Sequence, residues 1–256
     1  MRTSEERERR VKEISPGTVD IVIPMRQPSA GFVDRAAELL ALSDAPGAPF
    51  VRLILVDDAS GDDTWDRAAG IHRQFPGRVR AYRLGRRSGQ PAATCLGLLR
   101  SEAPVVVTMD DDGQHPASEL WRLVELVGNG RAQLVYGVPR EDRRPWGRRA
   151  AAACYRWGIA AAYRLPTSAA TSFRCLSGTL RERLRVRGKV HGLFDIALMQ
   201  LAGAAGVASV EVGFEYRPAE RSRYRVPMLL LFSICAALPV PWKTSRAEAH
   251  LIATLE

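Results

Sequence analysis

From Val19 to Gly137 the sequence alternates short apolar runs with segments whose apolar residues recur at helical spacing. The apolar runs are rich in valine, isoleucine and leucine and are bounded by turn residues, which is typical of buried strands. Ser60 is expected to cap the second helix. The expected strands are 19–24, 50–56, 79–84, 104–109 and 132–137, and the expected helices are 32–42, 61–75, 91–100 and 117–127. Such alternation with short connections predicts an α/β fold, a mostly parallel sheet flanked by helices on both faces.

Carboxylates follow two of the expected strands. Asp57 and Asp58 end the second strand, and the three aspartates 110–112 end the fourth. Ligands of parallel sheets bind beyond the carboxyl ends of the strands, so both groups are expected at one edge. Adjacent carboxylates repel one another, and oxygen ligands suit a hard divalent ion such as Mg²⁺ or Mn²⁺, which commonly holds a diphosphate. The pattern favours a metal-assisted nucleotide-sugar site, with a solvated acidic turn as the structural alternative.

The 256 residues carry a net charge of +9, and most of the positive charge comes from arginine. This balance favours an anionic partner, either a phosphorylated substrate, an anionic membrane or a nucleic acid. No nucleic-acid-binding motif appears, so we expect no nucleic acid partner. Neither GxGxxG nor the P-loop pattern GxxxxGK(S/T) is present, which argues against the usual dinucleotide and P-loop sites.

The opening residues, MRTSEERERRVKE, hold no apolar stretch of a signal peptide. No window reaches the roughly 18 consecutive apolar residues of a membrane-spanning helix. The four cysteines lack zinc-site spacing and suit the free thiols of a cytosolic protein. We therefore expect a cytoplasmic protein, peripheral on the inner face of the membrane if it contacts lipid.

Beyond Gly137 the alternation stops and arginines gather in VPREDRRPWGRRA. The expected elements are a helix over about 146–163, a strand over 171–177, a helix over 193–204 and a strand over 209–216. The chain then divides into a charged lead-in, 1–17, a single domain, 18–225, and a C-terminal helical segment, 226–256. Residues 226–242 suit a helix in a membrane interface, with arginines on lipid phosphates. A helix packed on the domain, or on a second subunit of a homo-oligomer, is the alternative.

Several of these stretches together resemble glycosyltransferase family 2, whose members have the GT-A fold. The likeness runs from about Val19 to Tyr224 and is most specific in VDDASGDDT, residues 56–64, and DDDGQHP, residues 110–116. Gly89, Gln90, Ala92 and Ala93 resemble the family's GQxAA helix start. Within the family the chain looks most like the polyprenyl-phosphate sugar transferases of the dolichol-phosphate mannose synthase type. That likeness is carried by Arg140, Arg148–Arg149, Ser172–Phe173–Arg174 and the run 217–224.

The resemblance implies a role for each motif residue. The implied metal ligands are Asp110, Asp112 and Gln114, and the implied donor-binding residues are Pro24, Asp57, Gln90, Asp110 and Asp111. Asp57 stands at a strand end, where it can accept a hydrogen bond from a nucleobase, whereas Asp58 is expected to position its loop. Arg140 and Arg149 would grip the acceptor phosphate with bidentate forks and form the catalytic set with Asp112.

Three positions depart from the family pattern. The opening motif reads PMRQP at 24–28, Ser172 stands where an aspartate is usual, and Glu220 stands where a glycine is usual. His115 is expected to pack the turn beside the metal loop.

The acceptor is inferred from a missing motif. We find no general-base motif of the hydroxyl-acceptor members, and Asp195 reads at least as well as a charge at a helix N-terminus. A phosphate acceptor is already deprotonated and needs only charge compensation and positioning. The favoured reaction is metal-dependent, inverting transfer of a sugar from a nucleotide-sugar to a polyprenyl phosphate, and transfer to a small-molecule acceptor stays open.

Overall fold

The structure is a computed structural model that describes residues 17–140, 170–187, 189–191, 194–214, 241–243 and 250–256, together with Ala153. Within them, a mixed sheet has the strand order β10-β3-β2-β1-β4-β6-β5-β8, and β7 (Lys189–His191) pairs separately with β9 (Pro241–Lys243). The strands of the main sheet are β1 (Thr18–Met25), β2 (Phe50–Asp57), β3 (Val79–Leu84), β4 (Val105–Thr108), β5 (Leu134–Pro139), β6 (Arg174–Ser177), β8 (Val207–Val212) and β10 (Leu251–Leu255).

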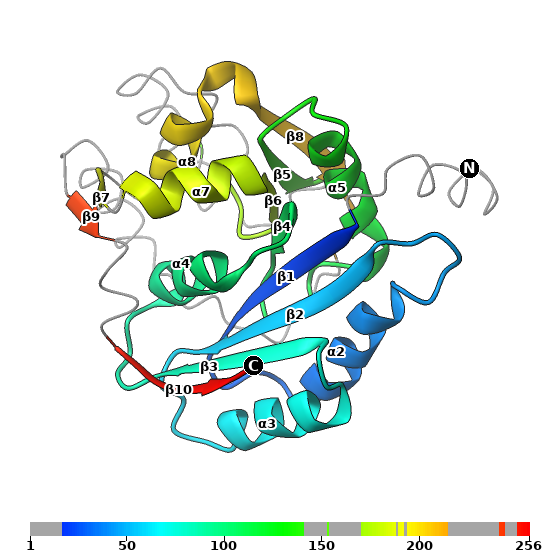
Figure 1. The fold of residues 1–256 in the computed structure, drawn as a ribbon, viewed down its shortest axis with the longest axis vertical. Helices are drawn as coiled ribbons and strands as arrows, with labels where there is room; N and C mark the ends of the chain where they lie inside the picture. The colour runs from blue at the N-terminus through cyan, green and yellow to red at the C-terminus, as the bar shows by residue number, and fades with distance from the viewer. Residues whose placement is uncertain are drawn as a thin grey trace.

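Helices cover both faces of this sheet (Figure 1). On one face pack α2 (Phe32–Ala41), α3 (Thr64–Gln74) and α5 (Leu120–Gly128). On the other pack α4 (Gln90–Arg100), α7 (Gly178–Arg187) and α8 (Phe194–Ala202). Short 3-10 helices lie at Ala117–Glu119 and Ala204–Gly206. The α/β fold with a helix-covered sheet, expected from the alternation, is confirmed.

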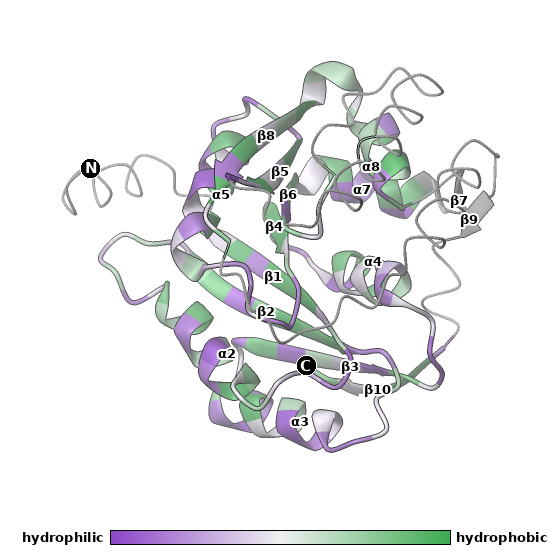
Figure 2. Cartoon of the chain, turned by 180° about the vertical axis from the view of Figure 1, so that it is seen from behind, coloured by the Kyte–Doolittle hydropathy of each residue, from purple (hydrophilic) through white to green (hydrophobic). Residues whose placement is uncertain are grey.

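The two faces arise from the alternation of side chains along each strand. On β1, Ile21 and Ile23 belong to the core under α2, while Val22 between them belongs to the core under α4. Both cores are apolar because the strands carry apolar side chains on both faces, as is usual in a parallel sheet. Gly97 lets α4 approach closely, since a Cβ there would lie 2.3 Å from Cγ1 of Val22. Figure 2 shows the apolar strands and the hydrophilic outer faces of the helices.

The central strands are parallel as expected, with β1 paired to β2 and β4, and β2 paired to β3. The second half of the sheet is mixed, because β6 runs antiparallel to both β4 and β5. β6 spans four residues, shorter than the strand expected over 171–177. Helix α7, which follows β6 at once, was not expected from the sequence.

The prediction of a helical segment over 226–256 is wrong for residues 241–243 and 250–256, which are the part of it that the structure describes. Leu251–Leu255 forms β10, an edge strand antiparallel to β3, and Pro241–Lys243 forms β9. Residues 251–255 read LIATL, with alternate side chains more and less exposed, which is the period of a strand. Residues 226–240, the expected helix 146–163 apart from Ala153, and the lead-in 1–16 lie outside the described residues. In the described part of the chain no helix is long and apolar enough to span a membrane.

Ser60 does not cap α3, which begins at Thr64 with Asp63 as its N-cap residue. The Ser60 hydroxyl instead accepts a hydrogen bond from the Gln27 backbone N–H at 3.1 Å, and its own N–H donates to Asp57 Oδ1 at 2.9 Å. The prediction placed the start of the helix three residues too early because the acidic GDDT run reads as a first turn. Residues 61–63 instead belong to the loop between β2 and α3.

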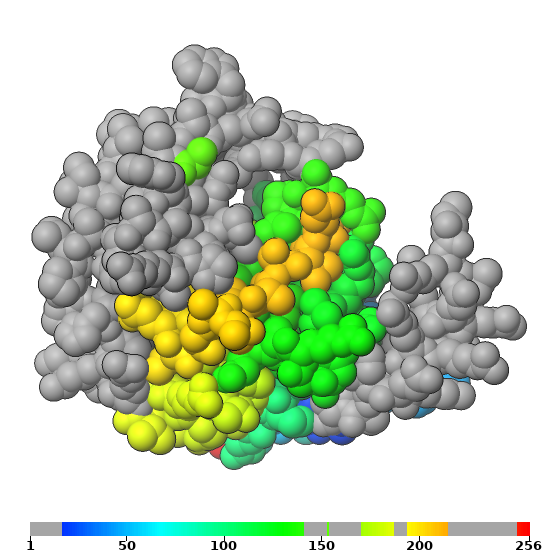
Figure 3. Space-filling model, turned by 90° about the horizontal axis from the view of Figure 1, so that it is seen from above, coloured from blue at the N-terminus to red at the C-terminus, as the bar shows by residue number. Residues whose placement is uncertain are grey.

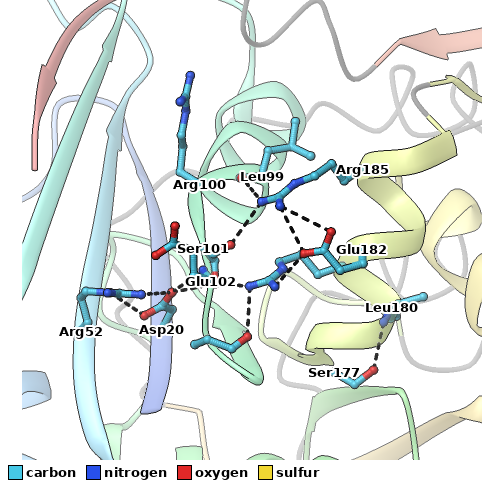
Figure 4. A network of polar contacts seen from close by, with 12 residues as sticks. Asp20, Arg52, Leu99, Arg100, Ser101, Glu102, Ser177, Leu180, Glu182 and Arg185 are labelled. Atoms are coloured by element: carbon cyan, nitrogen blue, oxygen red, sulfur yellow. Dashed lines mark hydrogen bonds and ion pairs between the residues drawn. The ribbon is translucent and has the colours of Figure 1, made fainter.

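A buried polar network ties the amino-terminal ends of β1 and β2 to the helices behind them (Figure 4). Asp20, on β1, has no exposed surface, and Arg52, its neighbour on β2, donates to both its oxygens at 2.8 and 2.9 Å. The Ser101 hydroxyl donates to Asp20 Oδ2 at 2.7 Å and accepts from Arg181 of α7 at 3.1 Å. This network lies at the edge opposite the aspartate loops, so its role is to fix α7 and the turn before β4 against the sheet.

Candidate active site

The two aspartate groups meet at one edge of the sheet, as predicted. β1 lies between β2 and β4, and its last residue, Met25, is in register with Asp57. The loops that follow the three strands contact one another directly. The Arg26 N–H, after β1, donates to Asp111 Oδ2 at 2.9 Å, and an Arg26 guanidinium N–H donates to the Asp58 carbonyl at 3.1 Å. The acidic loop after β4 is therefore joined to the loops that follow β1 and β2.

Asp110 is held from two sides. Its Oδ1 accepts from the Gln90 side-chain amide, at the start of α4, and its Oδ2 accepts from the Ser172 hydroxyl at 2.6 Å. The Asp110 N–H donates to Nδ1 of His115 at 3.2 Å. Gln90, expected from the resemblance to bind the donor, thus reaches the acidic loop itself.

Asp112 is less fully engaged than Asp110. Its Oδ1 accepts from the Gln114 backbone N–H at 2.9 Å, and no described residue donates a hydrogen bond to its Oδ2. Burial raises the pKa of Asp112, the Gln114 N–H opposes the rise, and the nearby charge of Asp110 adds to it. A cation at this carboxylate would offset both the cost of burying its negative charge and the repulsion from Asp110.

The chemistry of this loop fits a divalent cation. Asp110, Asp112 and Gln114 supply oxygen donors, which hard cations prefer, on five consecutive residues. In the part of the chain that the structure describes, no three His, Cys, Asp or Glu side chains already converge on one point. The three aspartates bond to different partners, so the loop has the right donors without a preassembled carboxylate cage.

His115 packs against aromatic rings beside the acidic loop, as expected. It is 4% exposed, stacks on Phe173 at a centroid distance of 5.0 Å and meets the Phe214 ring edge-on at 5.0 Å. Burial lowers the pKa of His115 to about 4, so it is neutral near pH 7 and its Nδ1 accepts from Asp110 N–H. These contacts are those of a residue that shapes the turn.

Arg35 of α2 also contacts the acidic loop, which the sequence did not indicate. Its guanidinium donates to the Gly113 carbonyl at 3.3 Å, and its Nε is buried without a hydrogen-bond partner among the described residues. A Cβ on Gly113 would lie 2.0 Å from this guanidinium. Glycine at 113 therefore allows a positive side chain to lie directly against the acidic loop.

Gly113→Ala is expected to lower turnover about tenfold or more, because the new methyl group must displace Arg35 from the loop. The φ of Gly113 is +74°, so alanine also lowers the free energy of unfolding by about 1–2 kcal/mol. Gly77→Ala is the matched control, since its φ is +75° and nothing lies within 4 Å of the added Cβ. Equal turnover of the two variants, measured on folded protein, would contradict a role for the Arg35 contact.

Asp57 and Asp58 differ in their surroundings. Asp58 accepts from the Ser88 and Gly89 backbone N–H groups at 2.6 and 2.9 Å, and so positions the loop before α4 as expected. Asp57 has no exposed surface, accepts from the Ser60 N–H, and lies 3.3 Å from Nε of Arg83 on β3. These are loop-shaping contacts, and the nucleobase contact of Asp57 stays a prediction.

Pro24 is buried within β1 opposite Val56 on β2. Pro24 stands one residue before the end of β1, which leads into the loop at Arg26. The contact of Pro24 with the nucleotide-sugar also stays a prediction.

Arg140 follows β5, which pairs with β8. Figure 3 shows the orange residues of β8 against green residues of the chain. The Arg140 side chain is 55% exposed and lies 3.5 Å from Oε1 of Glu119. Burial opposes ionisation of Glu119, but hydrogen bonds from Arg122 and the Gly213 N–H lower its pKa below the ordinary value. Arg140 thus offers an exposed cation beside one carboxylate. Arg149, the second predicted acceptor arginine, lies outside the described residues.

A buried ion pair lies behind Ser172. Arg174, 4% exposed, is paired with Asp195 at the start of α8, and the Tyr136 hydroxyl donates to Asp195 at 3.1 Å. Burial works against the charge of Arg174, but Asp195 favours it, and the pKa of Arg174 is raised. The sequence left two roles open for Asp195, a general base and a charge at a helix N-terminus. Neither role included an ion pair with the buried Arg174 of β6.

Comparison with known proteins accords with this site. The sequence profile of Glycosyl transferase family 2 matches residues 20–185, more than half of the chain. An undecaprenyl-phosphate 4-deoxy-4-formamido-L-arabinose transferase of Edwardsiella ictaluri is 36% identical over 138 residues, 52% of this chain and 40% of that protein. An uncharacterized glycosyltransferase of Mycobacterium bovis is 30% identical over 195 residues, 75% of this chain and 85% of that one. This chain matches less than half the length of the first relative.

Solved structures share the fold at low sequence identity. Glucosyl-3-phosphoglycerate synthase from Mycobacterium tuberculosis, in complex with Mn²⁺, uridine diphosphate and glucosyl-3-phosphoglycerate, has a TM-score of 0.60 at 20% identity. The match covers 88% of this chain and 79% of that one, which confirms the expected GT-A-like fold. The matched profile includes both aspartate loops, and the fold brings those loops together at one edge of the sheet. The chain belongs to glycosyl transferase family 2.

Proposed function

We propose that this chain transfers a sugar from a nucleotide-sugar to the phosphate of a polyprenyl phosphate, with a divalent cation and with inversion at the anomeric carbon. The observation that supports binding of a nucleotide-sugar with a cation is the acidic loop at the sheet edge. In this loop Asp112 accepts a hydrogen bond at Oδ1, and Gln90 and Ser172 hold Asp110. The name of the Edwardsiella relative, an undecaprenyl-phosphate sugar transferase, supports the acceptor half.

The donor diphosphate would lie against the acidic loop, where Asp110, Asp112 and Gln114 would hold the cation. When bound, the cation would supply positive charge to the leaving nucleoside diphosphate. Gln90 and Ser172 keep Asp110 oriented, and Asp58 keeps the Ser88–Gly89 turn in place through two backbone hydrogen bonds. These contacts fix the loop before the donor arrives, so little reorganisation is needed during the reaction.

The acceptor phosphate would be positioned by arginine. Arg140 is exposed at the end of β5 and can present a planar fork to phosphate oxygens, in exchange for its contact of 3.5 Å with Glu119. A polyprenyl phosphate is already ionised near neutral pH, so attack on the sugar needs no proton removal. Asp195 accords with this chemistry, because Arg174 and Tyr136 engage its carboxylate.

Asp195→Asn is expected to keep turnover within about tenfold of wild type. Asp195 pairs with Arg174, so its role is to stabilise the fold and not to remove a proton from the acceptor. A lost general base would lower turnover about 10²–10⁴-fold. The free energy of unfolding should fall by about 2–3 kcal/mol, because the variant leaves the buried Arg174 charge uncompensated and Asp195 is only 33% exposed. Turnover per folded molecule, with stability measured in parallel, separates the two roles.

The acceptor is tested by release of nucleoside diphosphate from a panel of nucleotide-sugars with Mg²⁺ or Mn²⁺. Three arms contain a short polyprenyl phosphate, a small phosphorylated acid such as 3-phosphoglycerate, or no acceptor. Release that requires the polyprenyl phosphate is the expected result. Release only with the small acid would replace the lipid acceptor by a small phosphorylated one and leave the donor site intact.

A further inference from the structure

Ser172 makes a direct contact with the acidic loop through its hydroxyl. An ionised aspartate at this position could not donate the same hydrogen bond. The Ser172 hydroxyl donates to Asp110 Oδ2 at 2.6 Å. Ser172–Phe173–Arg174 resembles the family's DFR motif, which has an aspartate at the position of Ser172. An aspartate here would place two carboxylates within hydrogen-bond distance, which is costly unless a cation or a proton lies between them.

The position of Ser172 is fixed by a chain of buried contacts. The Thr108 hydroxyl, at the end of β4, donates to the Ser172 carbonyl at 2.7 Å. Nε of Arg174 donates to the Thr108 hydroxyl at 3.0 Å, and Arg174 is in turn paired with Asp195. Thr108 and Arg174 are 1% and 4% exposed. The backbone of Ser172 is thus held in place by contacts from β4, β6 and α8, and its hydroxyl donates to Oδ2 of Asp110.

Gln90 donates to Oδ1 of Asp110 through its side-chain amide, and Ser172 donates to Oδ2 through its hydroxyl. A carboxylate oxygen can accept more than one hydrogen bond or ligand bond. Two neutral donors therefore orient the carboxylate without adding charge. In metal sites, hydrogen bonds to a ligating carboxylate fix its orientation, and their loss typically weakens metal binding about 10–100-fold.

We propose that Ser172 is a positioning residue that sets the affinity of the acidic loop for its divalent cation. It orients Asp110 through one neutral hydrogen bond and leaves the site with one carboxylate fewer than the family pattern would give. This inference rests on the proposed metal site at Asp110, Asp112 and Gln114, and it concerns the binding of the cation rather than the identity of the acceptor.

The test measures Mn²⁺ binding by electron paramagnetic resonance on the full chain without any donor or acceptor. Ser172→Ala should raise the Kd for Mn²⁺ about tenfold, while Ser172→Thr, which keeps the hydroxyl, should restore it to within about twofold of wild type. Ser172→Asp adds a carboxylate beside Asp110 and should lower the Kd about tenfold, since ligand charge tunes cation affinity. Ser172→Asp should also melt at a lower temperature than wild type without metal and gain more from Mn²⁺.

Two further variants are controls for size and for net charge. Ser172→Asn is close in size to Ser172→Asp but carries no charge, and it should not bind Mn²⁺ more tightly than wild type. Asn129→Asp adds the same charge on the exposed turn after α5 and should leave the Kd unchanged. Wild type that binds Mn²⁺ while Ser172→Ala binds equally well would overturn this inference alone. Wild type that binds no Mn²⁺ would overturn the metal site and this inference together.

Discussion

Asp112→Asn is expected to lower turnover by on the order of 10²–10³-fold while the protein stays folded. Asp112 is partly buried in the loop after β4, and burial and the charge of Asp110 together raise its pKa. Asparagine keeps the oxygen that accepts from the Gln114 N–H but removes the charge that would hold the cation. The variant therefore separates the structural hydrogen bond from the charge.

The measurement is nucleoside diphosphate release at saturating donor, with Mn²⁺ binding recorded on the same samples. Asp44→Asn is a suitable control because Asp44 is 72% exposed and pairs with Arg78 only at 4.0 Å, before β2 and far along the chain from the acidic loop. Loss of both Mn²⁺ binding and turnover in Asp112→Asn, and of neither in Asp44→Asn, is the expected pattern. An Asp112→Asn variant with turnover near wild type would show that the reaction does not depend on this carboxylate.

Asp20→Asn should lower the free energy of unfolding by about 3 kcal/mol, the largest stability effect that we expect at a single site. The change removes the charge that Arg52 pairs with, and it weakens the acceptor shared by Ser101 and the Glu102 N–H (Figure 4). Asp20 is fully buried and the Arg52 side chain is 14% exposed, so water can compensate Arg52 only in part. Urea denaturation should show a lower midpoint with an unchanged slope.

The exposed ion pair of Asp44 again supplies the comparison for stability. Asp44→Asn should change the free energy of unfolding by less than about 0.5 kcal/mol, as is usual for surface pairs. Turnover of folded Asp20→Asn should stay close to wild type, because the Asp20 network lies at the edge of the sheet opposite the acidic loop. A loss of turnover without a loss of stability would contradict this assignment.

The sequence predicted the first half of the sheet well because each strand there carries its own period and its own turn residues. β3 and the ends of β1, β2 and β4 fall within one or two residues of expectation. The elements that were missed include helix α7 and strand β10. Helix α7 carries arginines at 181, 183, 185 and 187, and its short apolar face of Leu180 and Leu184 is hidden among them in the sequence. β10 is five residues long and gains its stability from pairing with β3, which no local pattern reveals.

The site was predicted as a set of residues but not as a set of contacts. The meeting of the aspartate loops follows from the topology of a parallel sheet. Asp58 has the expected positioning role, but it acts on the loop before α4 rather than on its own loop. The contacts of Arg35, Ser172 and the Arg174–Asp195 pair join segments far apart in the sequence. Ser172 and Arg174 stood out in the sequence as part of one motif and Asp195 as a possible base, but nothing in the sequence indicated their contacts.

The most direct test of the proposed function is the transfer of a labelled sugar into the organic phase with a short polyprenyl phosphate and Mn²⁺. The prediction is a lipid-soluble product in which the sugar is joined to the phosphate, with the anomeric configuration opposite to that of the donor. The product should disappear with a chelator and with Asp112→Asn. Label that never enters the organic phase with any donor, while the protein still binds Mn²⁺ and a nucleotide-sugar, would contradict the polyprenyl phosphate acceptor.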